Sequence, residues 1–338
     1  MKKAVIFGIG RSYQRIKDKL FKDYNVVALV DNDKKKIGSA VNDGGGYIIY
    51  SPDIIKDIDY DLVIITVLSN EIVNQLRKLG CINFKMNNIN ANIMEDGNFL
   101  FEHNKIKAVI MNVSDQYMFN EVFTEEEYGY LFNRKSVVID IGMNKGIVSM
   151  YFARNDCVES VYSYEPVTYT YEKALQNFKL TDESITKKIS PFNYGLGGNT
   201  EDRLVKGFTT ESTGYSSTIC LSDVLPQFDN VEYNISVKIK NAAHEFNKIV
   251  NEHRDCEIVC KIDAEGSEFE IIELLEKENL LRAVYTYMIE VHFCYMPDPP
   301  QALENIKKLF LRNNYTVVMN GTRFPSGAHM LYAIRREV

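Results

Sequence analysis

Over the first 90 residues, short apolar runs alternate with amphipathic stretches. Strands are predicted at Ala4–Phe7, Val26–Val30 and Asp61–Val67, and helices at Tyr13–Leu20 and Asn70–Leu79. Because a strand that is apolar along its whole length is covered on both faces, the sheet should be parallel and doubly wound. The pattern therefore predicts a small Rossmann-like α/β domain at residues 1–90.

A second, longer series of the same kind follows a region of weak periodicity. Asparagine is frequent at residues 87–104, so we place a linker at residues 91–108 and a second domain at residues 109–338. The short connection between the last two strands favours an antiparallel pair on a mostly parallel sheet. The fold class is thus α/β, with two doubly wound domains. Seven strands are predicted in the second domain, at 137–141, 160–164, 189–193, 257–262, 284–291, 315–319 and 329–334.

Residues 202–240 interrupt this second series. They are rich in threonine, serine, glycine and tyrosine, which predicts an inserted β-hairpin region over one end of the sheet. Insertions of this length often form lids or substrate walls. We therefore expect contacts with the acceptor substrate in this segment, although it contains no recognisable motif.

Charge and composition exclude several classes of function. The 338 residues have a net charge of −7 and no run of basic residues, so no nucleic acid partner is expected. No stretch reaches the roughly 18 apolar residues of a membrane span, and we expect a soluble cytoplasmic protein. The cysteines include no CxxC pair and should mostly be small core residues rather than disulfides or zinc-finger ligands. They are Cys81, Cys157, Cys220, Cys256, Cys260 and Cys294.

The strongest candidate site follows the strand predicted at residues 137–141. The sequence DIGMNKG brings Asp140 to the carboxyl end of this strand, and Gly142 and Gly146 allow a tight turn into a helix. A dinucleotide site favours GxGxxG, whereas here an acid precedes the first glycine. This order favours a cationic ligand with an amino-acid end, such as S-adenosylmethionine. The alternative is a turn that only closes a corner between strand and helix.

Glu165 strengthens the assignment of a nucleoside site. It ends the next predicted strand, in the sequence SYEP, about 20 residues after the glycine turn, where a carboxylate commonly holds both ribose hydroxyls. By itself, Glu165 could equally be an ordinary acid at the end of a strand. Together with Asp140, it favours a nucleoside ligand.

A cluster of charge follows the fourth predicted strand. The sequence KIDAEGSE places Lys261, Asp263 and Glu265 directly after a buried segment, where such crowding requires a ligand, a metal or mutual pairing. The order of DIGMNKG, SYEP, KIDAEGSEFEII and the later IEVH resembles that of the FkbM family of S-adenosylmethionine-dependent methyltransferases. The resemblance covers roughly residues 109–338, and KIDAEGSE is its most specific part.

The resemblance implies a role for each matching residue. Asp140, Gly142, Asn144 and Gly146 would line the methionine end of the cofactor, and Glu165 would hold its ribose. The turn after the third strand would border the adenine. The residues of that turn are Asn193, Tyr194 and Gly195. Met143 and Lys145 depart from the small or apolar residues that are more usual in the family, without disturbing the turn.

Methyl transfer to a hydroxyl requires alignment and a group that takes the acceptor proton. Neighbouring strand ends should bring Asp263, Glu265, Glu290 and His292 together, and we favour Asp263 or His292 as the base. Lys261 would tune the carboxylates, or serve only as a structural partner of Glu265. No metal is expected, the alternative being a divalent ion held by Asp263, Glu290 and His292. The other histidines are expected to be surface or core residues. These are His103, His244, His253 and His329.

The N-terminal turn is a weaker candidate. Gly8 and Gly10 follow the first predicted strand and Asp31 ends the second, but Tyr13 stands where a dinucleotide fingerprint has its third glycine. The domain is similar to Rossmann-like domains of sugar-modifying enzymes. A nucleotide or nucleotide-sugar could bind at Gly8, Gly10 and Asp31. Alternatively, the domain could be a scaffold that forms a homodimer.

Three functions follow from these observations. The first is an O-methyltransferase that acts on a sugar hydroxyl in glycan or nucleotide-sugar biosynthesis, with a small-molecule or glycan acceptor. The second is a nicotinamide-dependent oxidoreductase or epimerase that uses the N-terminal turn. The missing third glycine and the absence of a Tyr-x-x-x-Lys pair there argue against it. The third is a module that binds the cofactor without catalysis.

Overall fold

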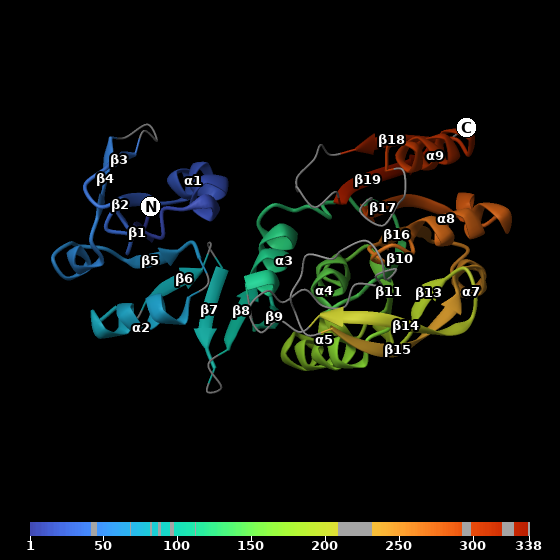
Figure 1. The fold of residues 1–338 in the computed structure, drawn as a ribbon, viewed down its shortest axis with the longest axis horizontal. Helices are drawn as coiled ribbons and strands as arrows, with labels where there is room; N and C mark the ends of the chain where they lie inside the picture. The colour runs from blue at the N-terminus through green and yellow to red at the C-terminus, as the bar shows by residue number, and fades with distance from the viewer. Residues whose placement is uncertain are drawn as a thin grey trace. The chain divides into compact units, whose positions relative to one another are not determined.

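The computed structural model divides into two compact units, Met1–Asn120 and Glu121–Val338 (Figure 1). The boundary falls within α3 (Val113–Phe123). This division differs from the expected one, which ended the first domain at residue 90. The structure describes the chain except for residues 42–45, 68, 82, 87–88, 95–97, 112, 209–231, 293–298, 320–327 and 337–338.

The first unit is a sheet of order β3-β4-β2-β1-β5-β6-β7-β8-β9, parallel from β4 to β6. Its helix α1 is amphipathic and buries Tyr13, Ile16 and Leu20 against the sheet. The predicted strands and helices of this region are all present. The elements are β1 (Lys3–Phe7), α1 (Arg11–Asp23), β2 (Asn25–Val30), β3 (Ala40–Val41), β4 (Tyr47–Tyr50), the 3₁₀ helix η1 (Pro52–Lys56), β5 (Leu62–Ile65), α2 (Asn70–Lys78), β6 (Phe84–Met86), β7 (Ile89–Ile93), β8 (Phe99–His103) and β9 (Ile106–Ile110).

Residues 91–108, expected as a linker, lie instead mostly in the antiparallel strands β7, β8 and β9. Alternate residues of β9 are buried, as in a strand with one face on a core. Asn104 and Lys105 both have positive φ, which is the backbone of a tight two-residue hairpin. The strands are short and interrupted by polar residues, and this hides the alternation in the sequence.

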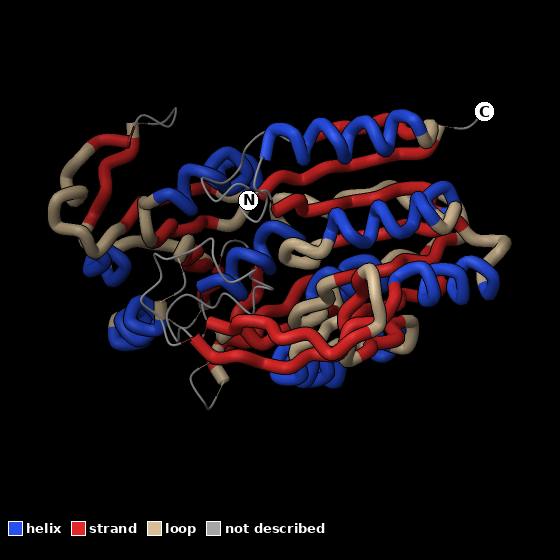
Figure 2. The backbone as a smooth tube through the Cα atoms, turned by 45° about the vertical axis from the view of Figure 1, so that its right-hand side comes forward, coloured by secondary structure: helices blue, strands red, loops and turns tan. Residues whose placement is uncertain are grey.

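The second unit contains a seven-stranded sheet of order β12-β11-β10-β16-β17-β19-β18. All neighbouring strands are parallel except β19, which is antiparallel to both β17 and β18. This confirms the expected α/β class and its terminal antiparallel pair. In Figure 2, α9 lies along β18 and β19 at the edge of the sheet.

The elements of this second unit follow the order of the chain. They are β10 (Ser136–Ile141), α4 (Ile147–Ala153), β11 (Val158–Tyr164), α5 (Thr168–Leu180), α6 (Glu183–Thr186), β12 (Ile189–Phe192), β13 (Gly195–Gly197), β14 (Glu201–Phe208), β15 (Glu232–Asn241), α7 (Ala242–Glu252), β16 (Glu257–Ile262), α8 (Glu268–Lys277), η2 (Leu281–Ala283), β17 (Val284–His292), α9 (Pro299–Arg312), β18 (Tyr315–Met319) and β19 (Ala328–Arg335).

The inserted segment forms a small sheet of its own. Strands β14 and β15 make the expected antiparallel pair, visible side by side in Figure 1, and β13 adds to β15 in parallel. Val205, Val237 and Ile239 pack with Val167 into a local core. The rest of the insertion, residues 209–231, lies outside the described residues. The pair β14 and β15 therefore brings an apolar surface to the loop that follows β11.

The central strands of the main sheet are largely buried, as β10 shows. Every residue of β10 is buried, which explains why its sequence reads as one apolar run broken only by Ser136 and Asp140.

Among the described helices, none is both long enough and apolar enough to cross a bilayer.

Candidate active site

A pocket opens at the carboxyl ends of β10, β11 and β16, where parallel sheets commonly bind ligands. Its open space is about 620 Å³, counted out to the surrounding solvent. One wall is apolar and includes residues of the inserted sheet, and the other carries the glycine turn and the acid cluster. The lining residues are Ile141, Gly142, Asn144, Glu165, Pro166, Val167, Gly195, Leu196, Val205, Ile239, Asp263, Ala264 and Glu265.

The turn after β10 requires glycine at Gly142. Its φ is +79°, and an added Cβ would lie 1.8 Å from the carbonyl oxygen of Asp263. The backbone amides of Gly142 and Met143 both donate to the carbonyl of Tyr164, at 3.0 and 2.9 Å. Gly146, with φ +78°, caps α4, and a Cβ there would lie 2.5 Å from the ring of Phe178. The turn is therefore pressed between its neighbouring strands and helix.

Asp140 lies beneath this turn rather than among the residues that line the pocket. Its side chain is fully buried, accepts a hydrogen bond from Ser149 Oγ at 2.5 Å and pairs with Lys261 Nζ at 3.3 Å. The same ammonium donates to the carbonyl of Gly142 at 2.5 Å and pairs with Asp263 Oδ2 at 3.4 Å. Burial lowers the pKa of Lys261, but Asp140 and Asp263 outweigh it and raise this pKa above its usual value. Lys261 thus stays charged and ties the turn to the acid cluster.

Glu165 borders the pocket with a carboxylate that has only backbone partners in the described structure. The amides of Asn144 and Val167 donate to its two oxygens, each at 2.9 Å. Burial raises the pKa of Glu165 to about 7, and these two amides oppose the rise. Hydroxyl donors from a ligand would stabilise the ionised form, so the environment suits the expected ribose contact.

Two residues of the turn after β12 have different roles. Gly195 lines the pocket, where a Cβ would lie 2.8 Å from Ile239. Asn193 does not line it. Its amide donates to the carbonyl of Glu165 at 3.0 Å and its oxygen accepts from Thr168, so it holds the loop after β11 in place.

Acidic residues from the turn after β16 and from β17 meet at His292, which is 8% exposed. His292 Nε2 lies 3.4 Å from Glu265, 3.9 Å from Glu290 and 4.0 Å from Asp263. The structure therefore brings together all four residues that the sequence placed beside the acceptor. Only Asp263 and Glu265 of the four line the pocket.

Sequence reasoning missed Glu268. Its fully buried carboxylate lies 2.7 Å from His292 Nδ1 and accepts from the amide of Gly266. It thereby orients the imidazole and braces the turn after β16 at once. The signal was its position as the third acid of KIDAEGSE, at the first residue of α8. Ser149, the donor to Asp140, was also missed, and its sequence context carries no comparable signal.

The charges of this cluster compensate one another. Burial lowers the pKa of His292, but Glu265 and Glu268 outweigh it and raise this pKa well above its usual value. Burial and then Asp263 raise the pKa of Glu290 well above the usual range of a carboxyl. The acids around His292 thus favour its protonated form, and burial among other acids favours the protonated form of Glu290.

The cluster also has the geometry of a cation site. Asp263, Glu265 and His292 each offer one ligand atom, and these three atoms lie within 4.8 Å of one another. The sequence alternative named Glu290 in place of Glu265. Carboxylate and imidazole ligands suit divalent ions such as Mn²⁺ or Zn²⁺.

The N-terminal turn has a different environment. Asp31 accepts from the amide of Ile9 at 2.7 Å, from that of Asp33 at 2.9 Å and from Lys36 Nζ at 2.8 Å. Burial raises the pKa of Asp31, but Lys36 and the two amides outweigh it and hold this pKa below its usual value. Gly8 has φ +98°, and a Cβ added to it would lie 2.9 Å from Thr66 Oγ1. A Cβ added to Gly10 would have no atom within 4 Å.

Comparison with known families gives two matches. The model described as "Methyltransferase FkbM domain" matches residues 140–317, more than half of the chain. The model described as "C2185-like, N-terminal" matches residues 1–87. No curated protein matches the sequence.

Solved structures resemble the chain at low identity. The methyltransferase FkbM of Methylobacillus flagellatus KT is 14% identical over 98% of this chain and 90% of its own, with a TM-score of 0.40. TrmK of M. capricolum, solved with S-adenosylhomocysteine, is 14% identical over 64% of this chain and 69% of its own, with a TM-score of 0.35. The UDP-D-quinovosamine 4-dehydrogenase of Vibrio fischeri is 23% identical over 23% of this chain and 71% of its own, with a TM-score of 0.20.

Proposed function

Because the chain belongs to the FkbM methyltransferase domain family, we propose that it transfers a methyl group from S-adenosylmethionine to a hydroxyl group of a saccharide. That it is a methyltransferase using this donor follows from the family. The saccharide acceptor is our proposal. The observation that carries it is a pocket lined both by Gly142, Asn144 and Glu165 and by the carboxylates of Asp263 and Glu265.

The pocket fits the donor in three respects. Gly142 lets the turn approach the backbone of Asp263 without a side chain in the way. Glu165 offers a buried carboxylate that two hydroxyl donors would stabilise. The apolar wall formed by Val167, Leu196 and Ile239 suits the flat face of a base. Lys261 and Asp140 support this arrangement from below the turn.

The acid cluster fits a hydroxyl acceptor. The donor, when bound, supplies an electrophilic methyl group on a sulfonium, and an alcohol must lose its proton as it attacks. Asp263 lines the pocket directly beside the glycine turn, so we assign it to hold the acceptor hydroxyl and take its proton. His292 lies behind these carboxylates, with Nε2 at 3.4 Å from Glu265 and 4.0 Å from Asp263.

Carboxylates also favour a polyhydroxylated acceptor over an apolar one. Glu265 faces the same pocket and can accept hydrogen bonds from further hydroxyls of a sugar ring. An apolar acceptor would desolvate these carboxylates without offering them a hydrogen-bond donor. A nucleotide-sugar or a glycan both satisfy this requirement.

Two measurements test the proposal. Calorimetric titration with S-adenosylhomocysteine should give saturable binding that the Glu165→Gln variant weakens, and unaltered binding in the variant would contradict the assignment of Glu165 to the donor site. A panel of nucleotide-sugars and glycans with labelled S-adenosylmethionine should then give turnover that Asp263→Asn lowers by about 10²- to 10⁴-fold. Turnover of aromatic or amine acceptors alone would refute the saccharide acceptor while leaving the family intact.

A further inference from the structure

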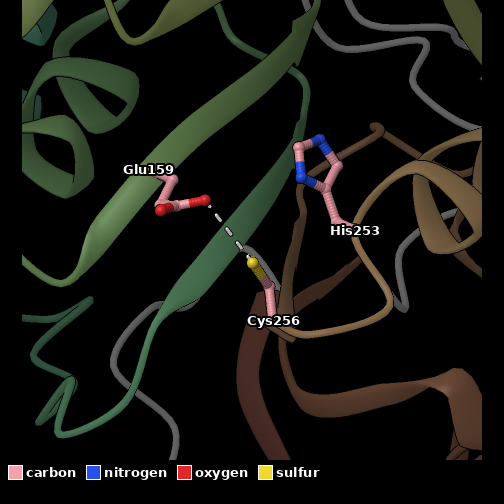
Figure 3. Close-up of side chains that lie close together, drawn as sticks. All are labelled: Glu159, His253 and Cys256. Atoms are coloured by element: carbon pink, nitrogen blue, oxygen red, sulfur yellow. Dashed lines mark hydrogen bonds between the residues drawn. The ribbon is translucent and has the colours of Figure 1, made fainter.

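A second group of ligand atoms lies at the amino end of the main sheet, opposite the pocket. Glu159 is on β11, His253 follows α7 and Cys256 directly precedes β16. Each offers one ligand atom, and these atoms lie within 4.8 Å of one another. Figure 3 shows the carboxylate of Glu159 and the sulfur of Cys256 pointing toward each other, at 3.7 Å. A carboxylate, an imidazole and a thiol thus converge on one point.

Hydrogen bonds to residues outside the group orient the imidazole of His253 so that one ring nitrogen can bind a metal ion. Its Nε2 lies 2.9 Å from the hydroxyl of Tyr162, and that hydroxyl donates to Glu252 at 3.4 Å. In the tautomer of His253 that is protonated at Nε2, this nitrogen donates to the Tyr162 hydroxyl, which in turn donates to Glu252. Nδ1 then keeps its lone pair, and one ring nitrogen faces Cys256 in Figure 3. Metal-bound histidines are commonly oriented in this way by a partner on the other nitrogen.

The ammonium of Lys135 lies beside this group of ligand atoms, which shows that the electrostatic potential there is negative. Lys135 Nζ pairs with Glu159 Oε1 at 3.1 Å and with Asp255 Oδ2 at 2.7 Å. The other oxygen of Glu159 is the one that faces Cys256. A metal ion and Lys135 could therefore share Glu159, one on each oxygen. Asp255 Oδ1, at 3.8 Å from Cys256 Sγ, is available as a further ligand.

We propose that Glu159, His253 and Cys256 form a zinc-binding site, with water or Asp255 as the fourth ligand. Thiolate, imidazole and carboxylate are the three side-chain ligands that zinc takes in tetrahedral sites. A thiolate disfavours Mg²⁺ and Ca²⁺, which take oxygen ligands. On binding, the sulfur–zinc bond replaces the sulfur–hydrogen bond and the proton passes to solvent, with no change of oxidation state. The ion would join β11 to the connection before β16, across the start of β10.

Cobalt(II) is the probe that reports the ligands directly. The untagged full chain, freed of metal by a chelator and kept reduced, should bind one equivalent of Co²⁺ at this site, besides any ion held by Asp263, Glu265 and His292. Binding should produce intense visible bands of tetrahedral coordination and a near-ultraviolet band from thiolate to metal. Stoichiometric Zn²⁺ should abolish both. Cys256→Ser should lose the thiolate band, and His253→Gln and Glu159→Gln should each weaken Zn²⁺ binding by about tenfold or more.

Matched controls come from the same unit. Cys157→Ser removes another partly exposed cysteine and His244→Gln another histidine, and both should bind Co²⁺ like the unaltered chain. Zn²⁺ should raise the melting temperature of the chain but not that of Cys256→Ser. Binding of S-adenosylhomocysteine should be equal in both, which separates this site from the methyl-transfer pocket. A thiolate band that is absent from the unaltered chain, or that survives in Cys256→Ser, would overturn the proposal.

Discussion

Two turns in this chain share one order of elements but differ in the charge around their acids. In each, a buried parallel strand ends at a glycine, a helix follows, and the next strand ends in an acid. Gly8 and Asp31 make one turn, and Gly142 and Glu165 make the other. Both acids accept two backbone amides. The local pattern alone therefore does not tell which turn binds a ligand.

The difference lies in the counter-charge. Lys36 pairs with Asp31, whose pKa lies below its usual value, whereas Glu165 has no cation in direct contact among the described residues and its pKa is raised to about 7. Asp31 is thus neutralised by its own chain. Glu165, which lines the pocket, is not neutralised in this way. The contrast therefore favours the turn after β10, rather than the N-terminal turn, as the ligand site that we propose.

The sharpest way to break this comparison is at the glycines themselves. We expect Gly142→Ala to lower the affinity for S-adenosylhomocysteine by about 100-fold or more. The added Cβ would lie 1.8 Å from the carbonyl oxygen of Asp263, at a residue whose φ is positive. Gly10→Ala is the matched control, since its Cβ would meet nothing within 4 Å. Calorimetric titration of both variants makes the measurement. Equal binding by the two would mean that the turn after β10 is not the donor site.

The second prediction compares the unfolding free energy lost when either of two acids is neutralised. One is Asp140, beneath the turn after β10, and the other is Asp31, after β2. Asp140→Asn leaves the ammonium of Lys261, 1% exposed, without its closest carboxylate, and should cost about 3–5 kcal/mol of unfolding free energy. Asp31→Asn should cost about 1 kcal/mol, because Lys36 is more than one-third exposed. Hydrogen exchange followed by mass spectrometry reads the two units separately, in peptides from β10 and from β1. Similar losses in both units would show that the two acids are equally structural.

Much of this comparison is visible in the sequence, but its outcome is not. Unbroken apolar runs such as that of β10 predict buried strands because both faces of the sheet are covered, and the acids at their ends follow. The pairing of Lys36 with Asp31 depends on how a loop folds back. The meeting of Glu159 with Cys256, 97 positions apart, depends on the order of strands in the sheet. Of the cysteines in the described part of the chain, Cys81 and Cys260 are in the core as expected, and Cys157 and Cys256 are not fully buried.

A pH titration should sharpen the contrast between the two acids. In the complex that we propose, ribose hydroxyls donate to the ionised form of Glu165, whose pKa is raised to about 7, so affinity for S-adenosylhomocysteine should be full above this pH. Below it, affinity should fall by up to about tenfold per pH unit as the carboxylate takes up a proton. Glu165→Gln should bind more weakly and with little pH dependence across this range. The measurement is the dissociation constant at each pH, and a variant with the same slope as the unaltered chain would assign the titration to another group.

The smallest expected effect concerns the N-terminal turn. We expect UDP, UDP-sugars and NAD⁺ to bind the unaltered chain weakly or not at all at this turn, because a ribose would have to compete with Lys36 for Asp31 and the buried Tyr13 stands in place of a third glycine. Lys36→Met should leave Asp31 uncompensated and raise nucleotide affinity by a few-fold in a fluorescence or calorimetric titration. Tight binding by the unaltered chain that Lys36→Met weakens would reverse the comparison. Lys36 would then be a phosphate ligand, and the N-terminal unit would be a nucleotide-sugar site in its own right.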